Sequence, residues 1–206
     1  MTEPRTIEEL IREEIRIGPY DPTWPVQFER EATFLLHRLP KNLIRRIEHF
    51  GSTAVPGLAA KPVIDILVEV SDLEETKRVI VPILQSDGYQ YFWRPTIDDQ
   101  PPFYAWFIKR NTDGQRTHHI HMVEADSALW DRLFFRDYLR LFADEADRYE
   151  RLKRSLADRF SDDRVAYTKE KSQYIISVTK KARVYFSQLR PDGGTSPNTQ
   201  NNGAGK

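Results

Sequence analysis

The segment that most constrains the fold of this chain is residues 63–70, with the sequence VIDILVEV. A β-branched run of this kind is typical of a buried strand. A second strand is predicted over Ile44–Phe50, and it leads directly into Gly51-Ser52-Thr53. The chain is therefore predicted to form a strand, then a glycine turn, and then a second strand that carries Asp65.

The remainder of the chain interleaves strands with helices and then ends in helices. A short strand is expected over residues 14–18. A helix is expected to begin at Asp21-Pro22 and to end at Pro40, because the apolar residues between them recur at helical spacing. Strands are also expected over residues 89–94, 103–110 and 117–123, and helices over residues 72–85, 127–142, 144–160 and 169–189. This order favours an α+β fold over a doubly wound parallel sheet.

Two further patterns predict a hairpin and the limits of the folded domain. Asn111-Thr112-Asp113-Gly114 is a turn signal, so the strands on either side are predicted to form a hairpin. We expect an N-terminal extension over residues 1–13 and one domain over residues 14–190. Residues 191–206 hold no large apolar side chain and are expected to be a disordered tail.

Composition excludes several functional classes. Lys plus Arg and Asp plus Glu both total 31, so the zero net charge gives no general reason to expect a nucleic-acid partner. The chain has no cysteine, which excludes disulfides, thiolate metal sites and cysteine nucleophiles. The first 16 residues lack the apolar core of a secretory signal, and no apolar run approaches the roughly 18–20 residues that span a bilayer. We therefore expect a cytoplasmic protein without a membrane partner.

The first candidate site joins Gly51, Ser52 and Thr53 to Asp65. A glycine after a strand lets the backbone approach a phosphate closely, and the two hydroxyls add donors. An aspartate on the next strand can hold a divalent cation that bridges phosphate oxygens. Enzymes with the nucleotidyltransferase fold use such a Gly-Ser turn, followed by Asp-x-Asp or Asp-x-Glu. Here the later position is Leu67, so the paired carboxylate is missing; the alternative reading is an ordinary strand and turn with a capping serine.

The second candidate is the histidine cluster in residues 117–121, THHIH. On a strand, His119 and His121 share one face about 7 Å apart, while His118 points to the other face. With Asp65 these imidazoles could hold a cation, and His49 could belong to the same cluster. Imidazole ligands would shift the metal preference from Mg²⁺ towards Mn²⁺ or Zn²⁺. A structural role remains the alternative for each histidine.

Cationic side chains supply the remaining candidates. Lys61 directly precedes the Asp65 strand, and Lys171 lies one helical turn from Tyr167, on the same helix face. Each lysine could reach a phosphate, although a solvated helix face also explains Tyr167 and Lys171. Arg136, beside Asp137, could orient a ligand or could form an ion pair within its helix.

Together these motifs resemble the GrpB (UPF0157) family over residues 15–183. The matching stretches are Tyr20-Asp21-Pro22, Trp24-Pro25, residues 47–68, residues 117–121, residues 135–140, Tyr167-Thr168 and Lys171. The resemblance implies a nucleotidyltransferase-like mixed sheet flanked by helices, with further helices at the C-terminus. It also implies that Leu67 is the family's own pattern, and that a similar domain occurs fused to some dephospho-CoA kinases.

Two functions remain open at this point. In the first, the chain is a nucleotidyl- or phosphoryl-transfer enzyme acting on a nucleotide or phosphorylated small molecule, with Asp65 as the catalytic residue and Mg²⁺, Mn²⁺ or Zn²⁺ as cofactor. In the second, the same pocket binds such a ligand without turnover, or the domain assists a partner enzyme. The fold alone does not decide between them, and the sequence leaves the oligomeric state open.

Overall fold

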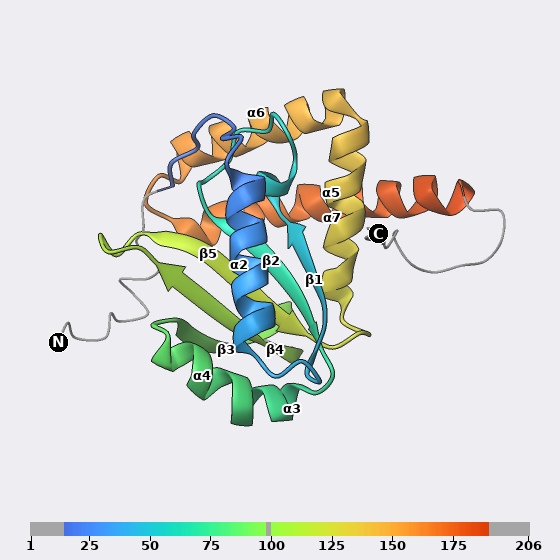
Figure 1. Ribbon diagram of the computed structural model, residues 1–206. Helices are drawn as coiled ribbons and strands as arrows, with labels where there is room; N and C mark the ends of the chain where they lie inside the picture. The colour runs from blue at the N-terminus through green and yellow to red at the C-terminus, as the bar shows by residue number, and fades with distance from the viewer. Residues whose placement is uncertain (1–14, 98–99, 190–206) are drawn as a thin grey trace, which may run out of the picture.

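A computed structural model of the chain describes residues 15–97 and 100–189. It shows a five-stranded mixed sheet with helices on both faces, which confirms the predicted α+β fold with C-terminal helices (Figure 1). The expected N-terminal extension, residues 1–13, and the expected disordered tail, residues 191–206, lie outside the described residues. The short strand expected over residues 14–18 is wrong within them, since only Gly18 pairs there, in an isolated bridge to Ala60.

The sheet has the strand order β1-β2-β5-β4-β3. Its members are β1 (Ile44–Phe50), β2 (Ile64–Val70), β3 (Gln90–Ile97), β4 (Gln100–Arg110) and β5 (Arg116–Val123). β2 and β5 run parallel, and the neighbours on either side pair antiparallel. β4 and β5 form the hairpin that the Asn111–Gly114 turn predicted. The parallel pair places Asp65 of β2 opposite His119 of β5.

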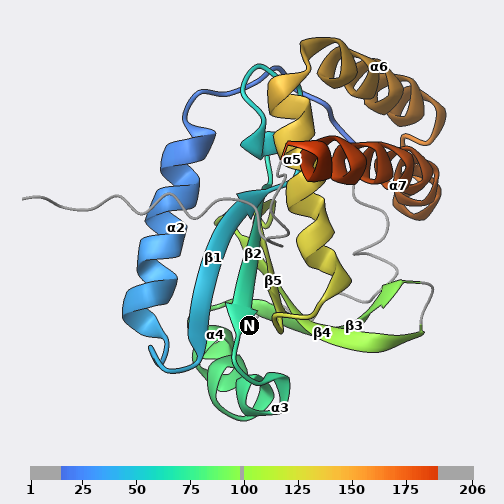
Figure 2. The same ribbon diagram turned by 90° about the vertical axis from the view of Figure 1, so that its right-hand side faces the viewer.

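One face of the sheet is covered by α2 (Trp24–Arg38), which Figure 2 shows on the side away from the C-terminal helices. Asp21 Oδ1 accepts a hydrogen bond from the Thr23 backbone N–H at 2.8 Å, and Pro25 lies in the first turn. The helix ends just before Pro40, as predicted. Alternate β2 residues, Ile64 and Ile66, face α2 in the main apolar core.

The helix predicted over residues 72–85 is present but irregular. It consists of α3 (Leu73–Glu75), a π-helical turn η2 (Thr76–Ile80) and α4 (Val81–Ser86). Asp72 caps its start by accepting a hydrogen bond from the Glu75 backbone N–H at 2.7 Å. Pro82 has no N–H for a regular α-helical bond, and the π turn lies directly before it. Ile80 and Leu84 of this segment pack into the same core as α2.

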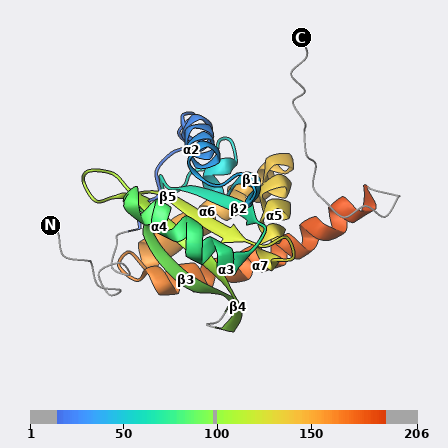
Figure 3. The same cartoon turned by 60° about the horizontal axis from the view of Figure 1, so that its bottom comes forward.

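The opposite face is covered by the C-terminal helices. They are η3 (Ala128–Trp130), α5 (Asp131–Leu141), α6 (Ala143–Arg159) and α7 (Arg164–Gln188), and Figure 3 shows the end of α7 projecting beyond the sheet. These helices share an apolar core with the loop after β1, through residues such as Val55, Phe135 and Tyr149. Because side chains alternate along β2, Asp65 and Leu67 face this helical layer. No helix among the described residues combines the length and apolar character needed to cross a membrane.

Candidate functional site

Gly51 brings the end of β1 against Asp65. Its φ angle of 75° lies in the left-handed region, which favours glycine. A Cβ atom at this position would lie 2.4 Å from Asp65 Oδ2, which is closer than real Cβ contacts. Residue 51 must therefore be a glycine both for its backbone angle and for the space that the carboxylate occupies.

Asp65 lies at the centre of a small polar cluster with His119 and His121. The Nδ1–H of His119 donates to Asp65 Oδ1 at 3.1 Å, while Arg116 Nη1 donates to His119 Nε2 at 3.4 Å. Both contacts are satisfied by the neutral Nδ1–H tautomer of His119. The nearest ligand atoms of Asp65, His119 and His121 lie within 4.8 Å of one another. The structure thus brings together three of the four predicted metal ligands.

The local charges favour the forms of these groups that bind cations. Burial raises the pKa of Asp65, but the hydrogen bond from His119 and the electrostatic effects of the two neighbouring imidazoles and of Lys171 outweigh it, so the pKa lies below its ordinary value. Burial also lowers the pKa of His121 to about 3. Asp65 is therefore an anion and His121 a neutral imidazole at pH 7, as a metal site requires. The Asp65 side chain remains 30% exposed, so a ligand can reach it.

This cluster lies in the wall of a cavity of about 350 Å³ between the sheet and the C-terminal helices. Asp65 is the only carboxylate among the described residues that line it. Six cationic side chains line it as well: Lys61, Arg94, Arg116, Arg132, Lys153 and Lys171. Such an excess of positive charge in an enclosed space favours an anionic ligand.

Three lysines lie on one side of the cavity. The Nζ atoms of Lys61 and Lys171 lie 5.0 and 5.3 Å from the centre of the Tyr167 ring, which is 1% exposed. Lys153, from α6, is 2% exposed and donates a hydrogen bond to the Ala59 carbonyl. Burial, with a contribution from Lys171, lowers the pKa of Lys153 to about 7. The predicted Lys61, Tyr167 and Lys171 therefore do meet in space.

The hydroxyl groups after Gly51 take different positions. Ser52 lines the cavity and forms a hydrogen bond with Tyr149. Thr53 is buried; its hydroxyl lies 3.0 Å from His49 Nε2 and donates to the Val63 carbonyl at 3.4 Å. Ser52 is thus the better placed of the two to meet a ligand.

His49 lies apart from the cluster of Asp65, His119 and His121, which corrects the prediction that placed it there. It pairs in register with Ile66, on the α2 face of the sheet, and its ring stacks on Phe28 at 4.8 Å. Burial lowers its pKa to about 4. Because neighbouring residues of a strand face opposite sides, Phe50 is the β1 residue on the Asp65 side, so His49 is a core histidine.

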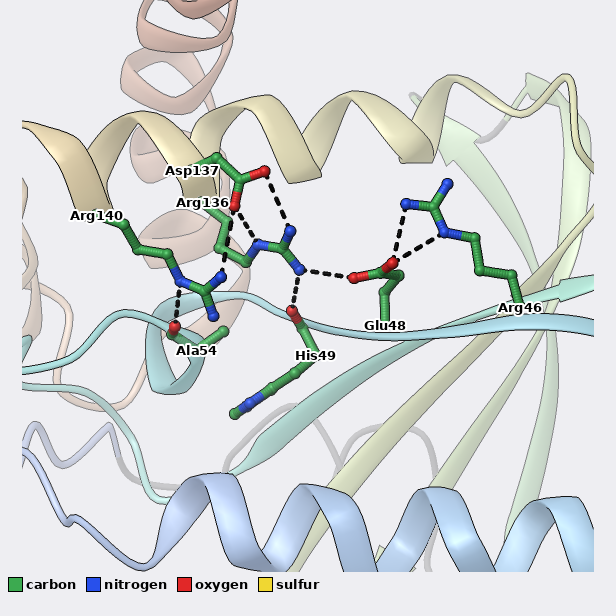
Figure 4. A network of polar contacts seen from close by, with 7 residues as sticks. All are labelled: Arg46, Glu48, His49, Ala54, Arg136, Asp137 and Arg140. Carbon is green, nitrogen blue, oxygen red and sulfur yellow. Dashed lines mark hydrogen bonds and ion pairs between the residues drawn. The ribbon is translucent and has the colours of Figure 1, made fainter. Parts of the chain in front are cut away.

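Arg136 is also placed away from the cavity, in the network of Figure 4. Its Nη1 atom donates to Glu48 Oε2 at 2.9 Å and to the His49 carbonyl at 2.8 Å, and its Nε atom donates to Asp137 at 2.7 Å. Arg140, one turn later, donates to the Ala54 carbonyl at 2.9 Å. Of the two roles considered for Arg136, the structure supports the ion pair rather than contact with a ligand in the cavity. The network of ion pairs and hydrogen bonds joins α5 to β1.

The cavity also contains functional candidates that the sequence patterns missed. Arg94 comes from β3, Arg132 from α5 and Lys153 from α6, while Trp106 and Tyr149 supply aromatic surfaces. None of them belongs to a local motif with the residues around Asp65. They meet Asp65 only through the packing of elements far apart in the sequence, so local spacing contains no signal for them.

Known proteins are similar to this chain in sequence or in structure. The family model described as GrpB protein matches residues 14–181. A UPF0157 protein of Pseudomonas aeruginosa is 40% identical over 169 residues, which cover 82% of this chain and 67% of that protein. The crystal structure of conserved protein GrpB from Enterococcus faecalis has a TM-score of 0.72 and 33% identity, over 83% of this chain and 99% of that one. A dephospho-CoA kinase of Mycolicibacterium paratuberculosis is 28% identical over 84% of this chain and 47% of its own length.

Proposed function

The chain belongs to the GrpB family, and we propose that its cavity binds a nucleotide or phosphorylated small molecule and transfers a nucleotidyl or phosphoryl group with the help of a divalent cation. The observation that best supports this proposal is the cluster of Asp65, His119 and His121 in the wall of a cavity with six cationic side chains. A carboxylate and two imidazoles beside an excess of cations suit a phosphate ligand that arrives with its metal ion.

The three side chains fit a divalent cation chemically. Asp65 supplies an anionic oxygen, and His119 and His121 supply nitrogen atoms within 4.8 Å of it. One oxygen with two nitrogen ligands favours Mn²⁺ or Zn²⁺ over Mg²⁺, which prefers oxygen. When bound, such an ion would polarise a phosphoryl oxygen and offset negative charge that develops on it.

The other residues of the cavity have roles that follow from their positions. Lys61 and Lys171, held against Tyr167, would neutralise phosphate oxygens on the side away from Arg94. Without a metal ion, Arg116 donates to Nε2 of His119 and helps to fix the ring beside Asp65. A metal ion bound at Nε2 would replace this contact and leave the hydrogen bond from Nδ1–H to Asp65. Ser52 would donate its hydroxyl to a phosphate oxygen in place of its bond with Tyr149.

Leu67 favours a second candidate function, ligand binding without turnover or assistance to a partner enzyme. It occupies the position at which a second carboxylate is expected, and it is fully buried in an apolar cluster with Phe50 and Val123. The match to less than half of a dephospho-CoA kinase also means that a domain of this kind occurs joined to further sequence. Under this candidate, the same cavity would hold the ligand without chemistry at Asp65.

Turnover measurements distinguish the two functions. Wild-type protein is incubated with nucleoside triphosphates and pooled metabolites in Mg²⁺, Mn²⁺ or Zn²⁺, and released pyrophosphate and phosphate are measured. The enzyme proposal expects release that Asp65→Asn lowers roughly a thousandfold, through loss of several kcal/mol of transition-state stabilisation. Asp113→Asn, in the exposed hairpin turn, is the matched control and should keep full activity. No release with any metal, or release that survives Asp65→Asn, would refute the enzyme proposal.

A further inference from the structure

Five of the six cations of the cavity fall into two groups on either side of the Asp65 cluster, while the sixth, Arg116, contacts His119 within it. Lys61 lies before the start of β2, whereas Arg132 lies in the first turn of α5, which follows the end of β5. Because β2 and β5 are parallel, the start of one and the end of the other lie at opposite ends of the sheet. The electrostatics agree: the charge of Lys171 acts on Asp65, and those of Arg94 and Arg132 act on His121.

Arg132 is a cation that no carboxylate of the described residues neutralises. It lines the cavity partly buried, and burial lowers its pKa. The neighbouring Asp131 forms an ion pair with Arg183. In the described part of the chain, no carboxylate lies within ion-pair distance of Arg132. Partial burial of an unpaired guanidinium costs free energy that an anionic ligand would offset.

Arg94 lies at the same end of the cavity. Its guanidinium lies 4.6 Å from the centre of the Trp106 ring, and it too has no carboxylate partner among residues 15–97 and 100–189. The indole N–H of Trp106 is buried and lacks an acceptor in those same residues. Two arginines thus gather at this end, and Arg94 lies over an indole ring whose N–H lacks an acceptor in the described residues.

Lys153 marks the opposite end. It is 2% exposed, and the Ala59 carbonyl is its hydrogen-bond acceptor. Glu150, one turn earlier on α6, is engaged by Arg154 at 2.9 Å and by the Ala59 backbone N–H. Lys153 is therefore a buried amine without a carboxylate partner in the described structure, and it lies with Lys61 and Lys171.

We propose that the ligand of this cavity carries two separate anionic groups, a phosphoryl group at the lysine end and a second phosphate or a carboxylate at the end formed by Arg94 and Arg132. This inference rests on the proposed function and specifies its substrate class. Between the two ends lie Asp65, His119 and His121, so the bond that reacts would lie near the phosphoryl group. A ligand with one anionic group would leave either Lys153 or the pair of Arg94 and Arg132 without a counter-charge from the described residues.

Calorimetric titration with matched sugar phosphates tests the proposal. The probes are fructose 1,6-bisphosphate and fructose 6-phosphate. A second pair, 3-phosphoglycerate and glycerol 3-phosphate, tests a carboxylate, and each probe is titrated in Mn²⁺ and again in EDTA. At least one doubly anionic probe should bind about tenfold or more tightly than its singly anionic counterpart. Arg132→Gln and Arg94→Gln should remove this advantage and leave binding of the singly anionic probe unchanged.

Arg148→Gln is the control, because Arg148 is an exposed arginine of α6 outside the cavity. It should leave every affinity unchanged. Arg94 is exposed on β3, so its substitution tests the proposal even if Arg132→Gln impairs folding. Equal affinity for both members of each pair, no binding of any probe, or an advantage that survives Arg94→Gln would overturn the inference. Equal affinity would contradict the second anionic group but would still agree with a phosphate site. The proposed transfer reaction is tested independently, by the turnover assay.

Discussion

The Nδ1 atom of His119 lies 3.1 Å from Oδ1 of Asp65, across the parallel pair of strands β2 and β5. The two residues are 54 positions apart in the sequence and are directly opposite each other in the sheet. Their hydrogen bond lowers the pKa of Asp65 against the opposing effect of burial. This pair therefore keeps a carboxylate ionised inside a cavity, where the surrounding cations can attract a phosphate.

The first prediction concerns Gly51. Gly51→Ala should destabilise the protein more than Gly57→Ala, because both glycines have positive φ angles but only Gly51 faces Asp65. Gly57→Ala should lower the free energy of unfolding by about 1–2 kcal/mol, because alanine is strained at a positive φ angle. Gly51→Ala should lower the free energy of unfolding by about 1–3 kcal/mol more than Gly57→Ala does, because its Cβ atom would overlap the carboxylate. Urea unfolding measures both values, and equal losses would mean that the Asp65 carboxylate does not fill this space.

The second prediction concerns Arg136, which pairs with Glu48 and Asp137 at the junction of α5 and β1. Arg136→Met should lower the free energy of unfolding by about 2–4 kcal/mol, because it leaves the half-buried carboxylates of Glu48 and Asp137 and the buried His49 carbonyl without their donor. The exposed Arg148 provides a control, since Arg148→Met should change stability by less than about 0.5 kcal/mol. Phosphate affinity of the folded Arg136→Met protein should equal that of wild type. A stable variant with weakened phosphate binding would instead restore the ligand role first considered for Arg136.

The local parts of this site could be predicted from the sequence. The β-branched run around Asp65 and the turn between β4 and β5 identified the strands, and alternation placed His119 and His121 on one face. The side on which His49 lies depends on the register of β1 against β2, which a single sequence does not fix. Arg132 and Lys153 reach the cavity through the docking of α5 and α6. Their sequence neighbours look like ordinary charged helix surface, so only tertiary structure reveals them.

The third prediction is a pH dependence of anion binding. Burial holds the pKa of Lys153 near 7, so its Nζ is a cation below that pH and neutral above it. Sulfate does not titrate between pH 5.5 and 8.5, and its affinity should fall roughly tenfold as the pH rises through about 7 and one charged donor is lost. Calorimetry at a series of pH values measures this change.

Lys153→Met provides the control for this pH profile, since it removes the amine and keeps an unbranched side chain. Its sulfate affinity should be weak and nearly independent of pH. A flat profile in wild type, or the same slope in Lys153→Met, would contradict the assignment. Stability should change with pH in the opposite direction to sulfate affinity. Between about pH 7 and 10, Lys153 is more protonated in the unfolded chain than in the folded protein. The free energy of unfolding of the ligand-free protein should therefore increase as the pH rises.

The fourth prediction concerns the choice of metal. Since Leu67 replaces a carboxylate and two ligands are imidazoles, Mn²⁺ and Zn²⁺ should bind more tightly than Mg²⁺ in the absence of nucleotide. His119→Ala should weaken this binding by at least about tenfold. His37→Ala, on the exposed face of α2, should leave it unchanged. Tight Mg²⁺ binding that is unaffected by His119→Ala would show that the ligands lie elsewhere.

The most direct test of the metal-binding centre is anomalous diffraction from crystals soaked in Mn²⁺ or Zn²⁺. The proposal predicts an anomalous difference peak in the cavity, at about 2.0–2.3 Å from an Asp65 oxygen and from nitrogen atoms of His119 and His121. Crystals of Asp65→Asn, soaked in the same way, should lose that peak. A peak that persists in Asp65→Asn, or a wild-type cavity without a peak at saturating metal, would contradict the central claim that Asp65 is the centre of a metal-dependent site.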